Sequence, residues 1–218
     1  MKKLICVIPA LEKNDYSNHG DLLKWGGTTL IEWKISQVLK VKKLEKIIVT
    51  TPSRKIKLLL KNYNVDVLVR KPNLSLNKLY KFIGKKYKNK KILWLNPTAP
   101  FLSEKIINKI IENYIKNSKK FDSSFTCTEL REFLFLNGKS LNFNSNKKAI
   151  SRKKLPKIFQ SSNGAYIVDA NHMEKQETLY GKKPIKYVVP WLQSLEIKSL
   201  SEVENYKFFI SKYIRENI

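Results

Sequence analysis

Cysteine and histidine are scarce in this sequence, with two of each in 218 residues. Cys6 and Cys127 both lie inside apolar segments of strand-like composition. Their spacing matches no metal-ligand motif, and free cysteines in apolar segments behave as small buried hydrophobic residues. The sequence therefore predicts two buried thiols rather than a metal site built on cysteine.

Long hydrophobic runs are also missing. No apolar stretch reaches the roughly 20 residues that a membrane helix needs. Met1–Lys3 leads directly into the apolar run Leu4–Ala10, with no small-residue cleavage site behind it. No internal repeat or flexible linker divides the chain. We therefore expect one domain over residues 1–218, in the cytoplasm and without a membrane partner.

Acidic residues are few: 18 Asp and Glu stand against 43 Lys and Arg, for a net charge of +25. An anionic partner such as nucleic acid, a membrane surface or a nucleotide phosphate would fit this charge. The lysines, however, are spread along the chain, and no RNA-recognition block, zinc finger or aromatic-interleaved basic segment is present. We interpret the charge as a result of Lys-rich composition and expect no nucleic-acid partner.

Buried strands alternate with amphipathic helices over the first half of the chain. The apolar runs without polar alternation indicate parallel strands covered on both faces, and they are Leu4–Pro9, Lys46–Thr51, Val65–Val69, Lys91–Leu95 and Ser124–Thr128. Helical spacing of apolar residues lies between them, in Thr29–Val38, Arg54–Lys61, Leu74–Tyr87 and Ser103–Lys116. The order predicts an α/β fold with a mostly parallel, doubly wound, Rossmann-like sheet.

A polar loop, Ala10–Thr28, follows the first strand. Open α/β sheets bind ligands at the carboxyl ends of their strands, and long loops in compact domains are often functional. We expect this loop, Asn96–Pro100 and Glu196 to form the mouth of a pocket.

The pattern of apolar and polar residues changes after the fifth expected strand. Phe133–Phe143 holds two apolar runs around Asn137-Gly138, which predicts a hairpin with a type I′ turn. A basic segment, Arg152–Gln160, follows. We interpret residues 131–162 as an excursion from the domain, and exposed apolar residues on such an excursion usually mark an interface. Strands at Ala165–Val168 and Ile185–Pro190 and a helix at Ser201–Tyr213 complete the expected order.

Short blocks spread over the whole chain resemble a known family. They are Ile5–Ala10 (ICVIPA), Gly27–Ile31 (GTTLI), Asn96–Pro100 (NPTAP), Asn163–Tyr166 (NGAY) and Ser194–Lys198 (SLEIK). In this order and spacing they are similar to the cytidylyltransferases that make CMP-activated acid sugars, the acylneuraminate type. The resemblance implies a nucleotidyltransferase that transfers CMP from CTP to an acid sugar with Mg²⁺, releases pyrophosphate, and forms a homodimer through the hairpin and arm.

The resemblance also implies roles for individual residues. Nucleotide contacts would fall on Ala10, Leu11, Lys13, Asp21, Lys24, Arg70 and Asn96. Contacts to the sugar would fall on Asn96, Arg152, Asn163, Gly164 and Tyr166, and the metal ligand would be Glu196.

Several positions depart from the family pattern. In the loop after the first strand, the family's leading Arg is Leu11, its Ser-Lys pair is Asn14-Asp15 and its Lys-Asn pair is Gly20-Asp21. An acid beside phosphates costs affinity through like-charge repulsion, although flexible lysines such as Lys13 and Lys24 could contribute charge.

The metal and sugar blocks depart as well. The family's Asp-Ile-Asp is Glu196-Ile197-Lys198, so an ammonium would compete with the metal for Glu196. The Tyr of the sugar block comes one place early, as Tyr166, which on a regular strand would change its face.

These departures leave alternatives open. The chain could be an active nucleotidyltransferase with a rearranged site, or a catalytically impaired relative that binds a nucleotide or sugar nucleotide. A glycosyltransferase on a related fold usually needs an Asp-x-Asp metal pair, which the Asn96 block lacks, and nucleic-acid binding would rest on charge alone. Release of pyrophosphate from CTP with an acid sugar separates the first two.

Overall fold

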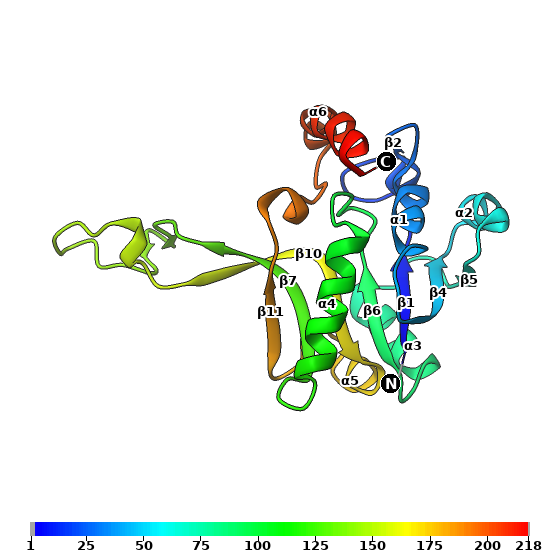
Figure 1. Cartoon of the computed structure of the whole chain (residues 1–218), viewed down its shortest axis with the longest axis horizontal. Helices are drawn as coiled ribbons and strands as arrows, with labels where there is room; N and C mark the ends of the chain where they lie inside the picture. The colour runs from blue at the N-terminus through cyan, green and yellow to red at the C-terminus, as the bar shows by residue number, and fades with distance from the viewer. Residues whose placement is uncertain (1–2, 218) are drawn as a thin grey trace.

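A seven-stranded sheet forms the centre of the molecule, in the order β11-β7-β10-β6-β1-β4-β5 (Figure 1). The computed structural model describes residues 3–217, with the side chains of residue 207 and of residues 211–217 left aside. The strands of this sheet are β1 Leu4–Pro9, β4 Leu44–Thr51, β5 Asp66–Val69, β6 Lys91–Leu95, β7 Ser123–Leu130, β10 Ile158–Asp169 and β11 Pro184–Val188.

All strand pairs in the sheet are parallel except the two made by β10, which runs antiparallel to β6 and β7. The expected α/β fold with a mostly parallel sheet is confirmed. The expected strand Ala165–Val168 is only the second half of β10. Its first half contains polar residues and a register shift between Ser161 and Tyr166, so it offers no apolar run to recognise.

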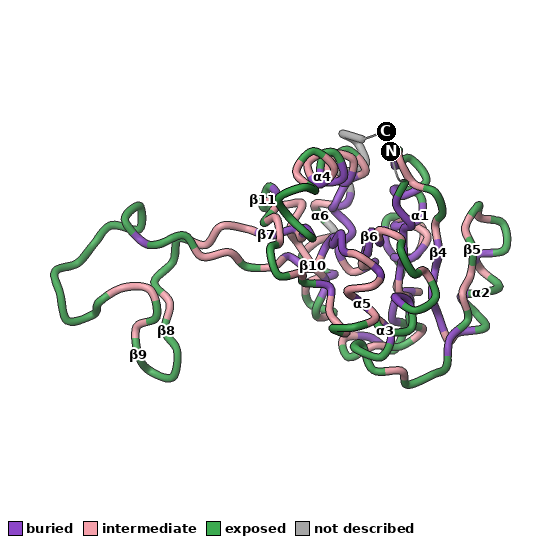
Figure 2. Tube along the Cα trace, turned by 90° about the horizontal axis from the view of Figure 1, so that it is seen from below, coloured by how far each residue is buried: buried purple, intermediate pink, exposed green. Residues whose placement is uncertain are grey.

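Helices cover both faces of the sheet. They are α1 Leu30–Val38, α2 Arg54–Leu59, α3 Leu76–Lys86, α4 Glu104–Asn117, α5 Ala170–Gln176 and α6 Leu200–Asn217. Side chains of β1 alternate between two cores, as a pleated strand requires: Cys6 and Ile8 pack with α1, α2 and α4, whereas Ile5 and Val7 pack with α3 and α5. The fold is therefore doubly wound, with its buried residues concentrated around β1 and β6 (Figure 2). Cys6 and Cys127 are both buried and free, as expected.

A third apolar cluster lies above the carboxyl edge of the strands. It joins Trp25 and Phe101, whose rings meet edge to face at 5.4 Å, to Ile197 and to Val203 of α6. Trp25 belongs to a short hairpin of β2 Lys24–Trp25 and β3 Thr28–Thr29, so the long loop after β1 carries structure of its own. This cluster fixes the loop, the segment after β6 and the start of α6 relative to one another.

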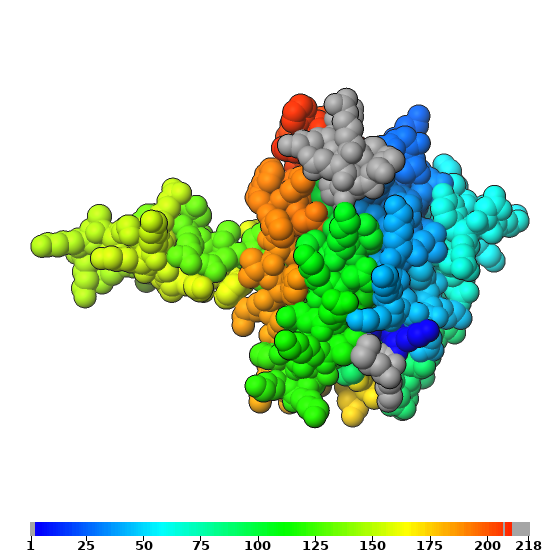
Figure 3. All heavy atoms as spheres, viewed as in Figure 1, coloured from blue at the N-terminus to red at the C-terminus, as the bar shows by residue number. Residues whose placement is uncertain are grey.

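An arm projects far from the domain (Figures 1, 2 and 3). It begins where β7 and β10 run on as a pair, with Ile158 opposite Leu130. Part-way along the arm the expected hairpin of β8 Phe135–Leu136 and β9 Lys139–Ser140 branches off to one side (Figure 2), and in it Asn137 and Gly138 both have positive φ, 50° and 77°. These angles fit a type I′ turn. Among the described residues, no helix is both long and apolar enough to cross a membrane.

Candidate active site

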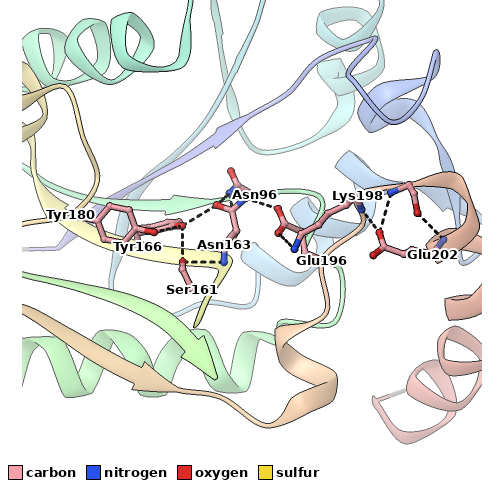
Figure 4. Close-up of polar contacts among 9 residues, drawn as sticks. Asn96, Ser161, Asn163, Tyr166, Tyr180, Glu196, Lys198 and Glu202 are labelled. Carbon is pink, nitrogen blue, oxygen red and sulfur yellow. Dashed lines mark hydrogen bonds and ion pairs between the residues drawn. The ribbon is translucent and has the colours of Figure 1, made fainter. Parts of the chain in front are cut away.

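Three of the blocks singled out in the sequence meet at the carboxyl edge of the parallel strands (Figure 4). Asn96 directly follows β6, and its amide contacts Asn163 of β10. The backbone N–H of Ile197 donates to the carbonyl of Thr98 at 2.8 Å and so holds the Glu196 segment against the Asn96 segment. Of the three segments expected to form one pocket mouth, the structure thus brings Asn96–Pro100 and Glu196 together, and that all three form one mouth stays a prediction.

Asn96 is held by hydrogen bonds on both sides of its amide. The indole Nε1 of Trp94 donates to its Oδ1 at 3.0 Å. Its Nδ2 donates to the carbonyl and to Oδ1 of Asn163, at 2.8 and 2.9 Å. Because both ends of the amide are paired, the side chain has a single defined orientation.

Asn163 lies at the centre of the cluster, in a left-handed backbone conformation with φ of 53°. Its Nδ2 donates to Oε1 of Glu196 at 2.5 Å, and its Oδ1 accepts from the hydroxyl of Tyr166 at 2.9 Å. The strand is irregular between Ser161 and Tyr166. This irregularity brings the Tyr166 hydroxyl to Asn163, although the residue comes one place early for a regular strand.

The hydroxyl of Tyr166 also meets Ser161 Oγ at 3.1 Å and the hydroxyl of Tyr180 at 3.3 Å. Burial raises the pKa of Tyr166, so it stays a neutral donor. Sequence reasoning missed both partners. Ser161 lies only two places before Asn163 and could have been included with that block, whereas Tyr180 comes from the loop after α5 and carries no local signal.

Gly164 spaces this cluster from the layer beneath it. A Cβ at this position would come within 3.1 Å of Leu102 and 3.2 Å of the Thr126 hydroxyl. Its carbonyl accepts from the N–H of Asn96 at 3.4 Å. The residue therefore serves close packing between β10 and the segment after β6.

Glu196 and Lys198 follow one another across Ile197 at the edge of the cluster. Oε2 of Glu196 lies 3.5 Å from Nζ of Lys198, and the Glu196 side chain is 13% exposed against 62% for Lys198. The backbone N–H groups of Lys198 and Ser199 donate to Glu202, at 2.5 and 3.0 Å. Glu202 thus closes the first turn of α6 and is committed to the backbone.

The donors around Glu196 do not fit a protein-held Mg²⁺. Magnesium prefers oxygen ligands in octahedral geometry, but one oxygen of Glu196 accepts from the Asn163 amide and the other faces the Lys198 ammonium. No group of three acidic, His or Cys side chains with metal-binding geometry occurs in the part of the chain that the structure describes. Glu196 stays the predicted metal ligand without a second carboxylate beside it.

A cavity of about 550 Å³ opens beside the cluster. Ser161, Glu196 and Lys198 line it together with the ends of β7 and β11, and Gln160 and Thr128 add an amide and a hydroxyl. Its size falls within the range of small-molecule sites. The lining combines polar donors and acceptors with apolar residues such as Trp191, which suits an amphipathic ligand.

Three side chains of helix α1 hold the loop after β6 by hydrogen bonds to its backbone carbonyls. Nε1 of Trp33 and Nε2 of Gln37 both donate to the carbonyl of Pro100, and Nζ of Lys34 donates to the carbonyl of Ala99, each at 2.8 Å. Lys34 is fully buried, and burial lowers its pKa to about 7. Sequence reasoning missed Lys34 and Gln37 because they lie on the apolar side of α1.

The loop after β1 folds back on itself. The N–H of Leu11 donates to Oδ2 of Asp21, and the N–H of Asp21 donates to the carbonyl of Leu11, both at 2.8 Å. Gly20 makes this return possible, because its φ is positive and a side chain there would collide with Leu11. Burial raises the pKa of Asp21 to about 7, against the opposing effect of the Leu11 hydrogen bond. The Asp21 carboxylate therefore faces the backbone rather than solvent.

The remaining nucleotide candidates lie along the same edge. Ala10 is buried and its N–H donates to Thr50, while Lys13 and Lys24 are exposed. Arg70 follows β5 and is only 8% exposed, yet its Nε has no hydrogen-bond partner and none of the described carboxylates pairs with it. Burial lowers its pKa. A buried guanidinium without a counterion is a ready site for an anion.

Arg152 lies apart from the other candidates. It sits on the projecting arm, where its Nη1 meets Oε1 of Glu132 at 3.2 Å. Within one chain the structure does not bring Arg152 to the Asn96–Asn163–Glu196 cluster.

The chain is similar in sequence to a known protein family over most of its length. The family model described as cytidylyltransferase matches residues 21–212, most of the chain. The chain belongs to the cytidylyltransferase family. The members of this family are nucleotidyltransferases with CTP as the nucleotide donor, and the matched region contains the Asn96, Asn163 and Glu196 blocks. No curated protein matches the chain by sequence.

Solved structures confirm the fold of this family member. CMP:2-keto-3-deoxy-manno-octonic acid synthetase complexed with CTP superposes with a TM-score of 0.71 at 11% identity, over 96% of this chain and 99% of that one. 4-Diphosphocytidyl-2C-methyl-D-erythritol synthase from Anaerococcus prevotii superposes with a TM-score of 0.70 at 12% identity, over 97% and 100%. At such identities the likeness concerns the fold alone.

Proposed function

We propose that this protein transfers CMP from CTP to an acid sugar. A hydroxyl oxygen of the sugar attacks the α-phosphorus, the bond from that phosphorus to the bridging oxygen of the β-phosphate breaks, and pyrophosphate leaves. The hydroxyl proton passes to solvent. One observation carries the proposal: Asn96, Asn163 and Glu196 form a fixed polar cluster at the carboxyl edge, beside a cavity large enough for a sugar.

The spread of cationic side chains supports a nucleotide along this edge. Arg70 ends β5, which is three strands from β6 in the sheet order. At about 4.8 Å per strand this places it roughly 14 Å from Asn96. A nucleoside triphosphate is about that long, so one molecule could reach from Arg70 to the cluster. Positioning and charge neutralisation are what phosphoryl transfer chiefly needs from a protein.

The cavity supports a polyhydroxylated acceptor. Ser161, Gln160 and Thr128 offer donors and acceptors to sugar hydroxyls. Asn163 contacts both Glu196 of the cavity wall and Asn96 at the nucleotide edge, so it can orient the attacking hydroxyl. Orientation of two bound reactants lowers the barrier by removing the entropy cost of their encounter.

We also propose a two-fold homodimer in which each arm reaches over the partner. Phe133, Phe135 and Phe143 pack edge to face at 4.9 and 5.2 Å, on an arm that buries little against its own domain. Such an apolar group in a projecting position is characteristic of an interface. Arg152, remote from the site of its own chain, would then approach the partner's cavity.

The test is a pyrophosphate-release assay with CTP, Mg²⁺ and a panel of acid sugars. We expect release with at least one acid sugar and a large loss of turnover in Asn163→Ala, because three partners lose their anchor. Asn108→Ala, on the outer side of α4, serves as a matched control and should keep its turnover. Absence of release with every acid sugar, from a folded protein that binds CTP, would contradict the proposed transfer.

That same result would support the second candidate, an impaired relative that binds nucleotide without transferring it. The observation in its favour is that the Asp21 carboxylate accepts a hydrogen bond from the Leu11 N–H at the start of the nucleotide loop. This N–H is then not free to bind a phosphate. If the wild type releases pyrophosphate as fast as a catalytically active reference enzyme in the same assay, this candidate is excluded.

A further inference from the structure

We propose that the ammonium of Lys198 takes the part of a protein-held divalent ion and binds the phosphates of the nucleotide directly. This inference rests on the proposed function. It starts from the mismatch between the Glu196 surroundings and a magnesium site. If the ammonium binds the phosphates, nucleotide binding by this chain does not need a side chain that holds a metal ion.

Both oxygens of Glu196 already face nitrogen. The Asn163 amide lies 2.5 Å from Oε1, and the Lys198 ammonium lies 3.5 Å from Oε2. To bind a divalent ion, the carboxylate would have to release the amide and place the ion next to a positive charge. Two charges of one sign at this separation repel each other, and a divalent ion doubles the repulsion. The geometry thus favours an ammonium at this place over a metal.

The backbone of Lys198 is fixed, whereas its side chain is free to reach a ligand. Its N–H is held by Glu202, and the neighbouring Ile197 is 1% exposed and tied to Thr98. The side chain is 62% exposed and lines the cavity. At 3.5 Å its contact with Glu196 is longer than a charge-assisted hydrogen bond, so the ammonium N–H groups remain available for an anion.

The other charges on the cavity wall are committed elsewhere. Glu129 pairs with Arg131 and Lys157, and Glu202 accepts from backbone N–H groups. Lys198 is the one cationic side chain among the described residues that line the cavity. Among these residues, an anion in the cavity can therefore form an ion pair only with this ammonium.

Calorimetric titration of CTP into the full chain tests the inference, in buffer with EDTA and in buffer with MgCl₂. The variants are Lys198→Gln, which removes the charge, and Lys198→Asp, which places a second carboxylate two residues from Glu196. Lys119→Gln is the matched control, because it lies beyond the far end of α4, about 20 Å from the start of that helix. Cytidine, titrated in parallel, reports contacts that do not involve phosphate.

We expect the wild type to bind CTP in EDTA as tightly as in MgCl₂. Lys198→Gln should weaken CTP about tenfold or more in EDTA, the worth of one charge-assisted contact, and leave cytidine unchanged. Lys198→Asp should bind CTP only with MgCl₂.

Three results overturn the inference. Wild-type binding that requires MgCl₂, or an unchanged affinity of Lys198→Gln for CTP, removes the role of the ammonium while leaving the proposed function in place. Lack of CTP binding in both buffers refutes the proposed function itself, and the inference falls with it.

Discussion

The buried Lys34 shows how single residues shape this site. Its Nζ reaches the Ala99 carbonyl from beneath and has no carboxylate partner within salt-bridge distance among the described residues. Burying an ammonium without a counterion costs stability while the group is charged. This loss in the free energy of unfolding occurs at the segment that orients Asn96. It indicates that the position of that segment matters to the protein.

Lys34 makes stability depend on pH. Burial lowers its pKa from 10.5 to about 7, so between these values the unfolded chain holds a proton that the folded chain does not. Its contribution is therefore full above pH 10.5 and is lost as the pH falls through about 7. In Lys34→Met, the free energy of unfolding should lack this slope, which is on the order of 1 kcal/mol per pH unit.

Urea unfolding at several pH values between neutral and alkaline, followed by circular dichroism, measures this difference. Lys57→Met on the exposed side of α2 is the control and should retain the slope of the wild type. Parallel curves for the wild type and Lys34→Met would show that Lys34 stays charged in the folded protein.

At the level of secondary-structure elements, the N-terminal cap of α1 fixes where the long loop ends and the helix begins. Thr29 caps α1 in a capping box: its hydroxyl accepts from the N–H of Glu32, whose carboxylate accepts from the N–H of Thr29. Glu32 also accepts from Tyr63. These contacts join the end of the long loop to the helix that holds the Asn96 segment.

Thr29→Ala should lower the free energy of unfolding by about 1 kcal/mol, the usual cost of losing such a cap. Ser36 lies in the last turn of the same helix, where its exposed hydroxyl donates to the Trp33 carbonyl, so Ser36→Ala should leave stability unchanged or slightly raised. Thermal or urea unfolding compares the two variants. A larger loss in Ser36→Ala than in Thr29→Ala would contradict the role assigned to the cap.

The elements that sequence patterns predict well are those with a continuous local signal. β1 and β6 are apolar throughout their buried parts, and the buried part of β4 is apolar up to Thr50 and Thr51. Ser103 begins α4 as a cap with Glu104 in the first turn. The site segments after these strands could therefore be placed from the sequence. The first half of β10 could not, because its pairing with β7 is long-range and its residues are polar.

The same contrast holds within the site. Asn96, Asn163 and Glu196 come from blocks with a recognisable order, whereas Tyr180 joins the cluster only through tertiary packing. Lys34 could not be found from helical periodicity, since the pattern assigns its side of α1 to the core. The turn of Asp21 toward Leu11 depends on the positive φ of Gly20, and Gly20-Asp21 looks in sequence like an exposed loop.

The whole molecule consists of a compact domain and a projecting arm. Aromatic residues and charged side chains share the arm, and its internal contacts join the hairpin only to neighbouring arm residues, as when Asn142 pairs with Glu132 and Leu134. Exposed Phe135, Leu136 and Leu141 have no partner surface on their own domain. The arm therefore adds little to the stability of the domain that bears it.

Replacing residues 134–149 by a short Gly-Ser linker should change the oligomeric state and leave the domain folded. We expect light scattering to report a dimer for the wild type and a monomer for this variant. The domain cores remain intact, so the circular dichroism spectrum should stay that of an α/β protein. A wild-type monomer at micromolar concentration would contradict the proposed exchange of arms.

We propose that the carboxyl edge from β5 to β6 binds a cytidine nucleotide next to the Asn96–Asn163–Glu196 cluster. A crystal structure of the protein grown with CTP would show the nucleotide and its contacts. We expect a nucleotide lying along that edge, near Arg70 at one side and Asn96 at the other, with a phosphate in contact with Lys198. A nucleotide bound elsewhere on the molecule, or one that leaves both Arg70 and Asn96 without contact, would contradict it.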